Sequence, residues 1–244
     1  MKEAIFPAER LGGFSLPLVK LRQGLVVAAL VFLAIAALQP GQAHTASDSM
    51  SFRVAPLDTG NCGARCPHVI VAEGVIESDT PQAFVDFLRS ESGDRRLKRI
   101  VFFNSRGGNV VASMVFGHIL RELRIAGIIG RFEGGADAGP FVGECLSACV
   151  YAMMGAVRRV APEGSHVALH RMSIVESEGG GWGAQAHVTR SFADRPMVAV
   201  LKRYARRMGV NPAMVALAES LPPDNMHVLT PAEMRRWSFA TGHF

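Results

Sequence analysis

A serine, a histidine and a pair of glycines stand in an order that could carry out acyl transfer. Ser147 lies within the small-residue segment 143–149, which begins with glycine, and His170 ends a short apolar run 23 positions later. The pair Gly107-Gly108 follows a second apolar run at residues 100–103. Acyl transfer requires a nucleophile, a base and hydrogen-bond donors that stabilise an oxyanion. These residue types and their order therefore predict a serine-type catalytic site.

Each of the three features also has a simpler interpretation when it is taken alone. A serine between Leu146 and Ala148 can be a small residue at the start of a helix, and a glycine pair can be a tight turn. The Gly-x-Ser-x-Gly elbow of α/β-hydrolases is absent, because the glycines that it requires do not flank Ser147. The prediction therefore depends on the three features occurring together.

Alternating strand-like and helix-like segments have to position these residues. Apolar runs predict strands at residues 69–75, 99–103, 126–132 and 166–169. Helices are expected to begin near Thr80, just after Gly108 and at Ala148. Beyond His170 we expect an exposed glycine-rich loop at 176–185, followed by helices at 198–208, at 211–221 and from a capping box at 230–233. The alternation predicts an α/β domain with parallel strands and crossover helices.

The first 43 residues have the pattern of an export signal. A flank with four basic residues precedes an apolar stretch at 24–38, and small residues at 41 and 43 fit a signal-peptidase site. This stretch of about 15 residues is shorter than the roughly 20 that span a bilayer, although flanking residues could extend it into an anchor. Both interpretations place the remainder outside the cytoplasm, in the periplasm or on the periplasmic face of the inner membrane. We therefore expect a signal peptide or membrane anchor at 1–43, a linker at 44–67 and one domain at 68–244.

The charge pattern and the cysteines limit the remaining function classes. Residues 1–43 carry four basic and two acidic side chains, so the net charge falls from +5 for the chain to +3 without them. The basic residues are dispersed without interleaved aromatics, which argues against nucleic acid as a partner. Of the two close cysteine pairs, we expect Cys62 and Cys66 to form a disulfide, whereas Cys145 and Cys149 would diverge if they lay on one helix. No histidine follows at a spacing that completes a zinc site, so no metal is expected.

The order of these motifs resembles the proteolytic subunit of Clp protease and the wider Clp/crotonase superfamily. Asn104-Ser105-Arg106-Gly107-Gly108 is similar to the family's Asn-Ser-Pro-Gly-Gly, with Arg106 in place of proline, and residues 143–151 match its nucleophile segment. Residues 167–170 match the strand that delivers the histidine. The resemblance covers residues 69–240, and more narrowly it points to the exported, single-domain Clp-like proteins of bacteria. It implies a spiral of β-β-α units with parallel strands and crossover helices.

The resemblance also implies a role for each residue of the candidate site. Ser147 would be the nucleophile and His170 its base, and Asp224 would orient the imidazole as the third member of a triad. The oxyanion hole would be formed by the Gly107-Gly108 turn and Ala148, with the amides of Gly108 and Ala148 as donors. In the related signal peptide peptidase A family the base is instead a lysine on a later helix, and Lys202 occupies such a position here. Lys202 is therefore the alternative base.

Taken as a whole, the resemblance implies an exported serine peptidase that hydrolyses peptide or protein substrates without a cofactor. Clp subunits are served by a cytosolic ATPase, but this chain has an export signal and no Gly-x-x-x-x-Gly-Lys motif, so we expect ATP-independent action. Assembly into a homo-oligomer is compatible with the family. The alternatives are a non-catalytic peptide-binding or scaffold module at the cell envelope and a Ser-Lys dyad peptidase. Acyl-CoA chemistry fits less well, because CoA is cytosolic.

Overall fold

The fold is defined by a computed structural model that describes residues 49–57, 62–133, 139–178, 187–222 and 224–241. The export signal or anchor expected at 1–43 lies outside the described residues, as do parts of the expected linker and of the glycine-rich segment at 176–185. All described residues belong to one compact unit, Ala46–Phe244. Within this described part, no helix combines the length and the apolar character needed to cross a membrane.

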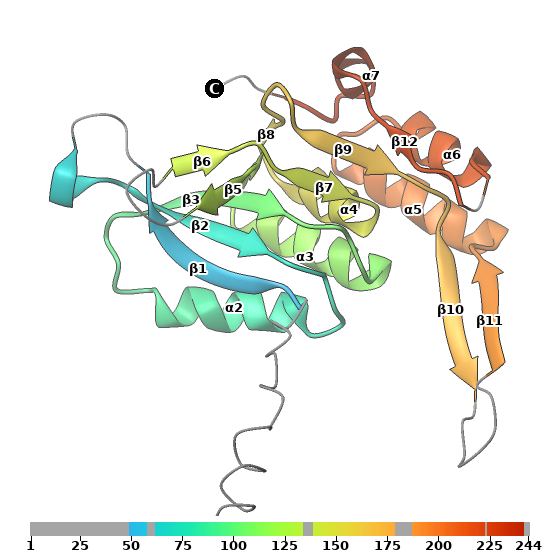
Figure 1. Cartoon of the computed structure of the whole chain (residues 1–244), viewed down its shortest axis with the longest axis horizontal. Helices are drawn as coiled ribbons and strands as arrows, with labels where there is room; N and C mark the ends of the chain where they lie inside the picture. The colour runs from blue at the N-terminus through green and yellow to red at the C-terminus, as the bar shows by residue number, and fades with distance from the viewer. Residues whose placement is uncertain (1–48, 58–61, 134–138, 179–186, 223, 242–244) are drawn as a thin grey trace, which may run out of the picture. The chain divides into compact units, whose positions relative to one another are not determined.

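The larger sheet contains five strands in the order β1-β2-β3-β4-β8. The parallel strands are β2 (His68–Glu73), β3 (Leu97–Asn104), β4 (Ala126–Ile129) and β8 (Arg159–Val160), and β1 (Ser51–Pro56) pairs antiparallel with β2 at the edge. Helix α2 (Thr80–Ser90) connects β2 to β3, and α3 (Val110–Glu122) connects β3 to β4 (Figure 1). Parallel neighbours need crossovers of this kind. The predicted α/β class with parallel strands and crossover helices is confirmed.

Both faces of this sheet are covered, which explains why its central strands are apolar on both sides. One face packs against α2 and α3 through strand residues such as Ile70 and Phe103. The other face carries a smaller cluster that contains Val71, Phe102 and Phe132. Strands with two buried faces have near-continuous apolar runs instead of an alternating pattern, as β3 shows.

A smaller sheet contains the segment that leads to Ser147. Its strands are β7 (Glu144–Leu146), β9 (His166–Leu169) and β12 (His227–Val228), with β9 in the middle, parallel to β7 and antiparallel to β12. An isolated parallel bridge between Ser105 and Cys145 links β7 to the end of β3. The Ser105 amide donates to the carbonyl of Glu144 at 2.8 Å, and the Ser105 carbonyl accepts from the Leu146 amide at 2.9 Å. The carboxyl ends of β3 and β7 therefore lie side by side.

Two of the remaining four helices in the described part of the chain begin with a side-chain cap. Helix α4 (Ala148–Gly155) follows β7 directly and is buried along its whole length. Helix α5 (Arg195–Arg207) is capped by the Asp194 side chain, which accepts from the Met197 amide at 2.8 Å. Helix α6 (Ala213–Ser220) follows, and α7 (Pro231–Arg236) begins with the predicted capping box between Thr230 and Glu233. These caps satisfy amides that have no acceptor within the helix.

Three segments differ from the sequence-based expectation. Part of the expected linker forms β1, whose alternating exposed and less exposed residues fit an edge strand. The run at 126–132 divides into β4 and β5 (Arg131–Glu133), and β5 pairs with β6 (Gly139–Phe141). The beginning of the glycine-rich segment belongs to β10 (Ser173–Glu178), which pairs antiparallel with β11 (His187–Phe192). The β-branched residues Ile174 and Val175 favour a strand there over a loop.

Candidate active site

Ser147 occupies a sharp turn between a strand and a helix. It follows β7 directly and is the N-cap residue of α4, with φ 54° and ψ −120°. A positive φ is unfavourable for a residue that has a side chain and costs about 1–3 kcal/mol, so the surrounding structure has to hold it. The Ser147 amide donates to the carbonyl of Ala168 in β9 at 2.8 Å, and its carbonyl accepts from Val150 at 3.1 Å. A turn of this kind presents a serine hydroxyl at the carboxyl end of a strand.

A disulfide closes this turn. Cys145 in β7 and Cys149 in α4 are joined across Ser147, with 5.2 Å between their Cα atoms, and both are fully buried. The expected divergence of these two side chains applies to cysteines on one helix, whereas the turn places one on a strand and the other on a helix. A second disulfide joins Cys62 to Cys66. All four cysteines of the chain are therefore paired.

The Gly107-Gly108 turn lies directly against Ser147. Gly107 has φ 102°, and a Cβ atom there would lie 2.8 Å from the Cβ of Ser147 and 2.9 Å from the amide nitrogen of Ala148. Gly108 has φ 133°, and a Cβ atom there would lie 2.1 Å from the carbonyl oxygen of Ile76. Both the backbone conformation and the lack of space require glycine at these two positions.

Two backbone amides at this point are suitable oxyanion donors. Ile76 forms hydrogen bonds of 2.7 Å to the residues on either side of Gly108. In parallel pairing this pattern turns the N–H of Gly108 itself away from Ile76. Ala148 is the first residue of α4, and its N–H has no acceptor within the helix. The amide of Gly107, by contrast, donates to the Oγ of Ser105 at 3.2 Å, so Gly107 shapes the turn and Gly108 and Ala148 are the candidate donors.

His170 follows β9, which is the parallel neighbour of β7. The register pairs Leu146 with Ala168, so the two strands deliver Ser147 and His170 at the same edge of the smaller sheet. Nδ1 of the half-buried His170 lies 2.7 Å from the carbonyl oxygen of Arg171. Because a carbonyl only accepts, Nδ1 donates in this contact, which leaves Nε2 as the ring nitrogen that could take up a proton. A histidine that acts as a general base through Nε2 needs this arrangement.

Asp224, the expected third member of the triad, has a different partner in the structure. Its carboxylate accepts from the guanidinium group of Arg190 at 2.7 Å, and 85% of its side chain is exposed. The Nδ1 atom of His170, which an orienting aspartate would contact, is bonded to the carbonyl of Arg171 instead. The structure therefore does not bring Asp224 to His170 in the manner of a triad.

A carboxylate that the sequence did not single out lies near the candidate base. Oε1 of Glu219 in α6 accepts from the amide of Met172 at 3.3 Å, and Oε2 is buried with no hydrogen-bond partner among the described residues. Burial raises the pKa of Glu219, while the Met172 amide and the charges of Arg171, His170 and Lys202 oppose this rise. Lys202, which is half-buried on α5, therefore lies close enough to interact with the same carboxylate as His170.

The sequence held one signal for Glu219. It is the single charged residue of α6, whose other residues are alanine, methionine, valine, leucine and serine. A lone carboxylate in an otherwise apolar helix is less often exposed to solvent than one on a charged face. Its presence there indicates a specific contact. The partner, Met172, lies 47 residues away in the sequence, so the contact itself has no local pattern.

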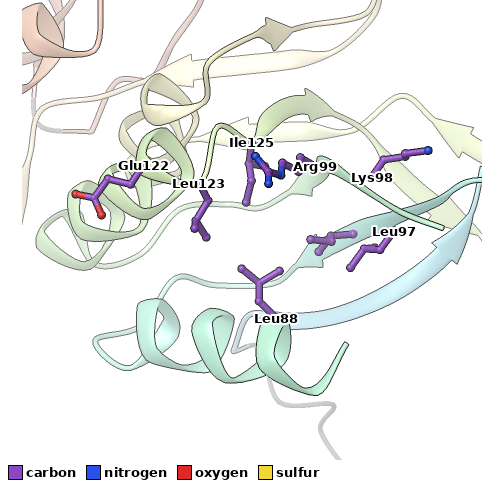
Figure 2. A pocket seen from close by; sticks show the side chains of 8 residues that line it. Leu88, Leu97, Lys98, Arg99, Glu122, Leu123 and Ile125 are labelled. Atoms are coloured by element: carbon purple, nitrogen blue, oxygen red, sulfur yellow. The ribbon is translucent and has the colours of Figure 1, made fainter. Parts of the chain in front are cut away.

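The structure also contains a hollow of about 340 Å³ that does not belong to this site (Figure 2). It lies where α2 and α3 end and where β3 and β4 begin, and it is lined by Ile70, Leu88, Leu97, Lys98, Arg99, Glu122, Leu123 and Ile125. Ser147 and the Gly107-Gly108 turn follow the carboxyl ends of their strands, so the hollow lies at the opposite end of the larger sheet. It contains no serine, cysteine or histidine that could act as a nucleophile or base.

Comparisons with known proteins give only distant similarity. No protein-family model and no curated protein matches the chain. Among solved structures, the chain is similar to a serine-to-alanine mutant of the 1510-N membrane-bound stomatin-specific protease, at 19% sequence identity and a TM-score of 0.46, over 70% of this chain and 75% of that one. It is also similar to a lysine-to-alanine mutant of the same protease in complex with a substrate peptide, at 18% identity and a TM-score of 0.43, over 70% of this chain and 71% of that one.

Proposed function

We propose that this protein is a serine-type peptidase in which Ser147 is the nucleophile and His170 is the general base. The observation that carries the proposal is the positive-φ turn at Ser147, which is held between the strand leading to His170 and the Gly107-Gly108 turn. Backbone strain of this kind persists only where the surrounding structure enforces it, and it clusters at functional sites. The resemblance of the motifs to the Clp/crotonase superfamily supports peptides as the substrate class.

In the proposed reaction, Nε2 of His170 is the proton acceptor, because Nδ1 contacts the Arg171 carbonyl. Nε2 takes the proton from the Ser147 hydroxyl while Oγ forms a bond to the substrate carbonyl carbon, and the carbonyl π electrons move to its oxygen. The tetrahedral intermediate then collapses, the C–N bond breaks, and Nε2 returns the proton to the leaving amine. Water repeats the sequence on the acyl-enzyme, with His170 again as the base, and releases the carboxylic acid and the free serine.

The amides of Gly108 and Ala148 would stabilise the negative oxygen of both tetrahedral intermediates. They belong to two different segments that meet at Ser147, the turn after β3 and the first turn of α4. The helix N-terminus adds a partial positive charge at the same point. Fixed donors of this type contribute about 3–4 kcal/mol each to the stabilisation of the transition state.

A second arrangement uses Lys202 as the base in place of His170. Its support is the half-buried position of Lys202 on α5, within electrostatic reach of the Glu219 carboxylate that also faces His170. The Glu219 carboxylate interacts with both Lys202 and His170, so it does not favour either of them as the base. His170 follows β9, the parallel neighbour of the strand that leads to Ser147, so we assign the base to His170.

Hydrolysis assays with fluorogenic peptides and esters test this function. Ser147→Ala should lower kcat about 10⁴-fold or more, and His170→Ala should have a comparable effect because the two residues act as a unit. Lys202→Met decides between the two bases. The Ser-Lys arrangement requires that Lys202→Met loses activity and that His170→Ala keeps full activity. A folded parent protein that hydrolyses none of these substrates and takes up no active-site reagent would instead support a peptide-binding module without catalysis.

We also propose that the peptidase is exported and acts without ATP. The basic flank and apolar stretch within residues 1–43 support export. Both disulfides support it as well, because such bonds persist in oxidising compartments and are rare in the cytosol. N-terminal sequencing of the protein recovered from fractionated cells would show whether the signal is removed, and recovery only from the cytosol would contradict export.

A further inference from the structure

One peptide group connects His170 to Glu219. The carbonyl of Arg171 accepts from Nδ1 of His170 at 2.7 Å, and the N–H of Met172 donates to Oε1 of Glu219 at 3.3 Å. This carbonyl and this N–H are the two ends of a single planar amide, whose electrons are delocalised between oxygen and nitrogen. A negative charge at the N–H end therefore increases the negative charge on the carbonyl oxygen, which strengthens its bond to the imidazole.

Glu219 is partly buried among charged and titratable groups. Its Oε2 is buried without a hydrogen-bond partner in the described part of the chain, an arrangement that costs stability. Charged and titratable groups approach it from three other parts of the fold: Tyr151 on α4, His170 and Arg171 after β9, and Lys202 on α5. Tyr151 is almost fully buried, and burial together with the charge of Glu219 raises the pKa of its phenol, so it stays neutral.

We infer that Glu219 is a positioning residue that supports His170 through the Arg171–Met172 peptide group, in the place that a direct aspartate partner has in a triad. Its charge holds the proton on Nδ1 and stabilises the imidazolium that forms when Nε2 takes the proton from Ser147. Glu219 itself neither accepts nor donates a proton in the reaction. This inference rests on the proposed function, because it needs His170 to act as the base.

The test compares Glu219→Gln with Glu219→Asp and with a matched control, Glu163→Gln, which neutralises an exposed carboxylate outside the site. Glutamine keeps the shape and an oxygen acceptor for the Met172 amide but removes the charge. We expect Glu219→Gln to lower kcat about 10- to 100-fold with little change in KM, as loss of an orienting group behind a catalytic residue does. Glu219→Asp should recover part of the activity, and Glu163→Gln should match the parent protein.

A second measurement is independent of activity. In a Ser147→Ala protein, the Nδ1 proton of His170 should give a downfield proton resonance that moves upfield or vanishes when Glu219→Gln is added. The inference would be overturned if Glu219→Gln changed neither the resonance nor kcat. It would also be overturned if Asp224→Asn lost activity while Glu219→Gln kept it. If the parent protein hydrolyses nothing, the proposed function fails, while the resonance still decides whether Glu219 acts on His170.

Discussion

The amide of Ser147 donates a hydrogen bond of 2.8 Å to the carbonyl of Ala168, and this bond ties the candidate nucleophile to the strand that carries its base. Ala168 lies opposite Leu146 in the parallel register of β7 and β9, and His170 follows two residues later. The relative position of Ser147 and His170 is therefore set by backbone pairing within one sheet. Substitutions that disturb the turn at Ser147 should consequently reduce activity more than they reduce stability.

Gly107→Ala should abolish activity because the new methyl group has no space. Its Cβ would lie within 3 Å of backbone atoms of Leu146 and Ala148 and of the Cβ of Ser147, at a residue with φ 102°. We expect a loss of stability of about 2–4 kcal/mol and displacement of Ser147. Thermal denaturation and peptide hydrolysis by the folded fraction would measure the two effects.

Gly209→Ala is the matched control for this substitution. Gly209 has φ 74°, but a Cβ atom there would meet nothing within 4 Å. The backbone strain alone should cost about 1–2 kcal/mol and leave kcat of the folded protein unchanged. Equal losses of kcat in both variants would contradict a specific role for the contact between Gly107 and Ser147.

Removal of the Cys145–Cys149 disulfide should impair catalysis as well as stability. The bond closes a short loop around Ser147, so its contribution to the free energy of unfolding is about 2 kcal/mol. We expect the double substitution Cys145→Ala with Cys149→Ala to lose that stability and to lower kcat, because the turn is then free to relax from positive φ. Removing the Cys62–Cys66 disulfide in the same way should lower stability but leave kcat of the folded protein unchanged. Unchanged kcat in both double variants would contradict the prediction.

Arg159→Met should destabilise the protein without a direct effect on the chemistry. The Arg159 side chain is 3% exposed and donates to backbone carbonyls of Met154, Ala156, Met208, Ser238 and Phe239 at 2.6–3.3 Å. Its loss removes this donor from the carbonyls of Ala156, Ser238 and Phe239, while those of Met154 and Met208 keep a bond from Arg121. The loss should cost about 3–5 kcal/mol. Thermal denaturation would measure this loss of stability. The control, Arg206→Met, removes an exposed arginine and should change the free energy of unfolding by less than about 0.5 kcal/mol.

Glu219→Gln should increase stability at neutral pH and not at acidic pH. Burial raises the pKa of Glu219 in the folded state, so the protonated carboxyl favours folding, and this contribution is lost as the pH rises through the folded-state value. Glutamine resembles the protonated form at every pH. The variant should therefore have a higher Tm than the parent at pH 7–8, and the difference should disappear below a pH of about 4, where both side chains are neutral. A Tm difference that is constant with pH would contradict this assignment.

The sequence predicted the elements whose signals are local. The runs that form β2, β3 and β9 and the caps at Thr230 and Glu233 depend on neighbouring residues, and the structure has them near the expected bounds. The position of Ser147 at the start of a helix followed from its motif. The motif did not predict the positive φ of Ser147, because the glycines that usually permit such a turn are absent. A disulfide spans the same positions instead.

The rest of the site depends on contacts between distant segments, which no local pattern records. The prediction of Asp224 rests on its distance along the chain from the closing motif, but its partner Arg190 lies on β11, in a hairpin whose first strand includes residues 176–178 of the expected loop. Glu219 meets Met172 only because α6 packs beside the segment after β9. A search for a third member of a triad by sequence spacing could not find a carboxylate that acts through a peptide group.

Covalent labelling with a fluorophosphonate probe tests the central claim most directly. The purified protein would be incubated with the probe and digested, and the modified residue identified by mass spectrometry, with Ser147→Ala and His170→Ala treated in parallel. We predict one label per chain on Ser147, no label in Ser147→Ala and labelling slowed by orders of magnitude in His170→Ala. Labelling that persists in Ser147→Ala, or that proceeds at an unchanged rate in His170→Ala, would contradict a site in which His170 activates Ser147.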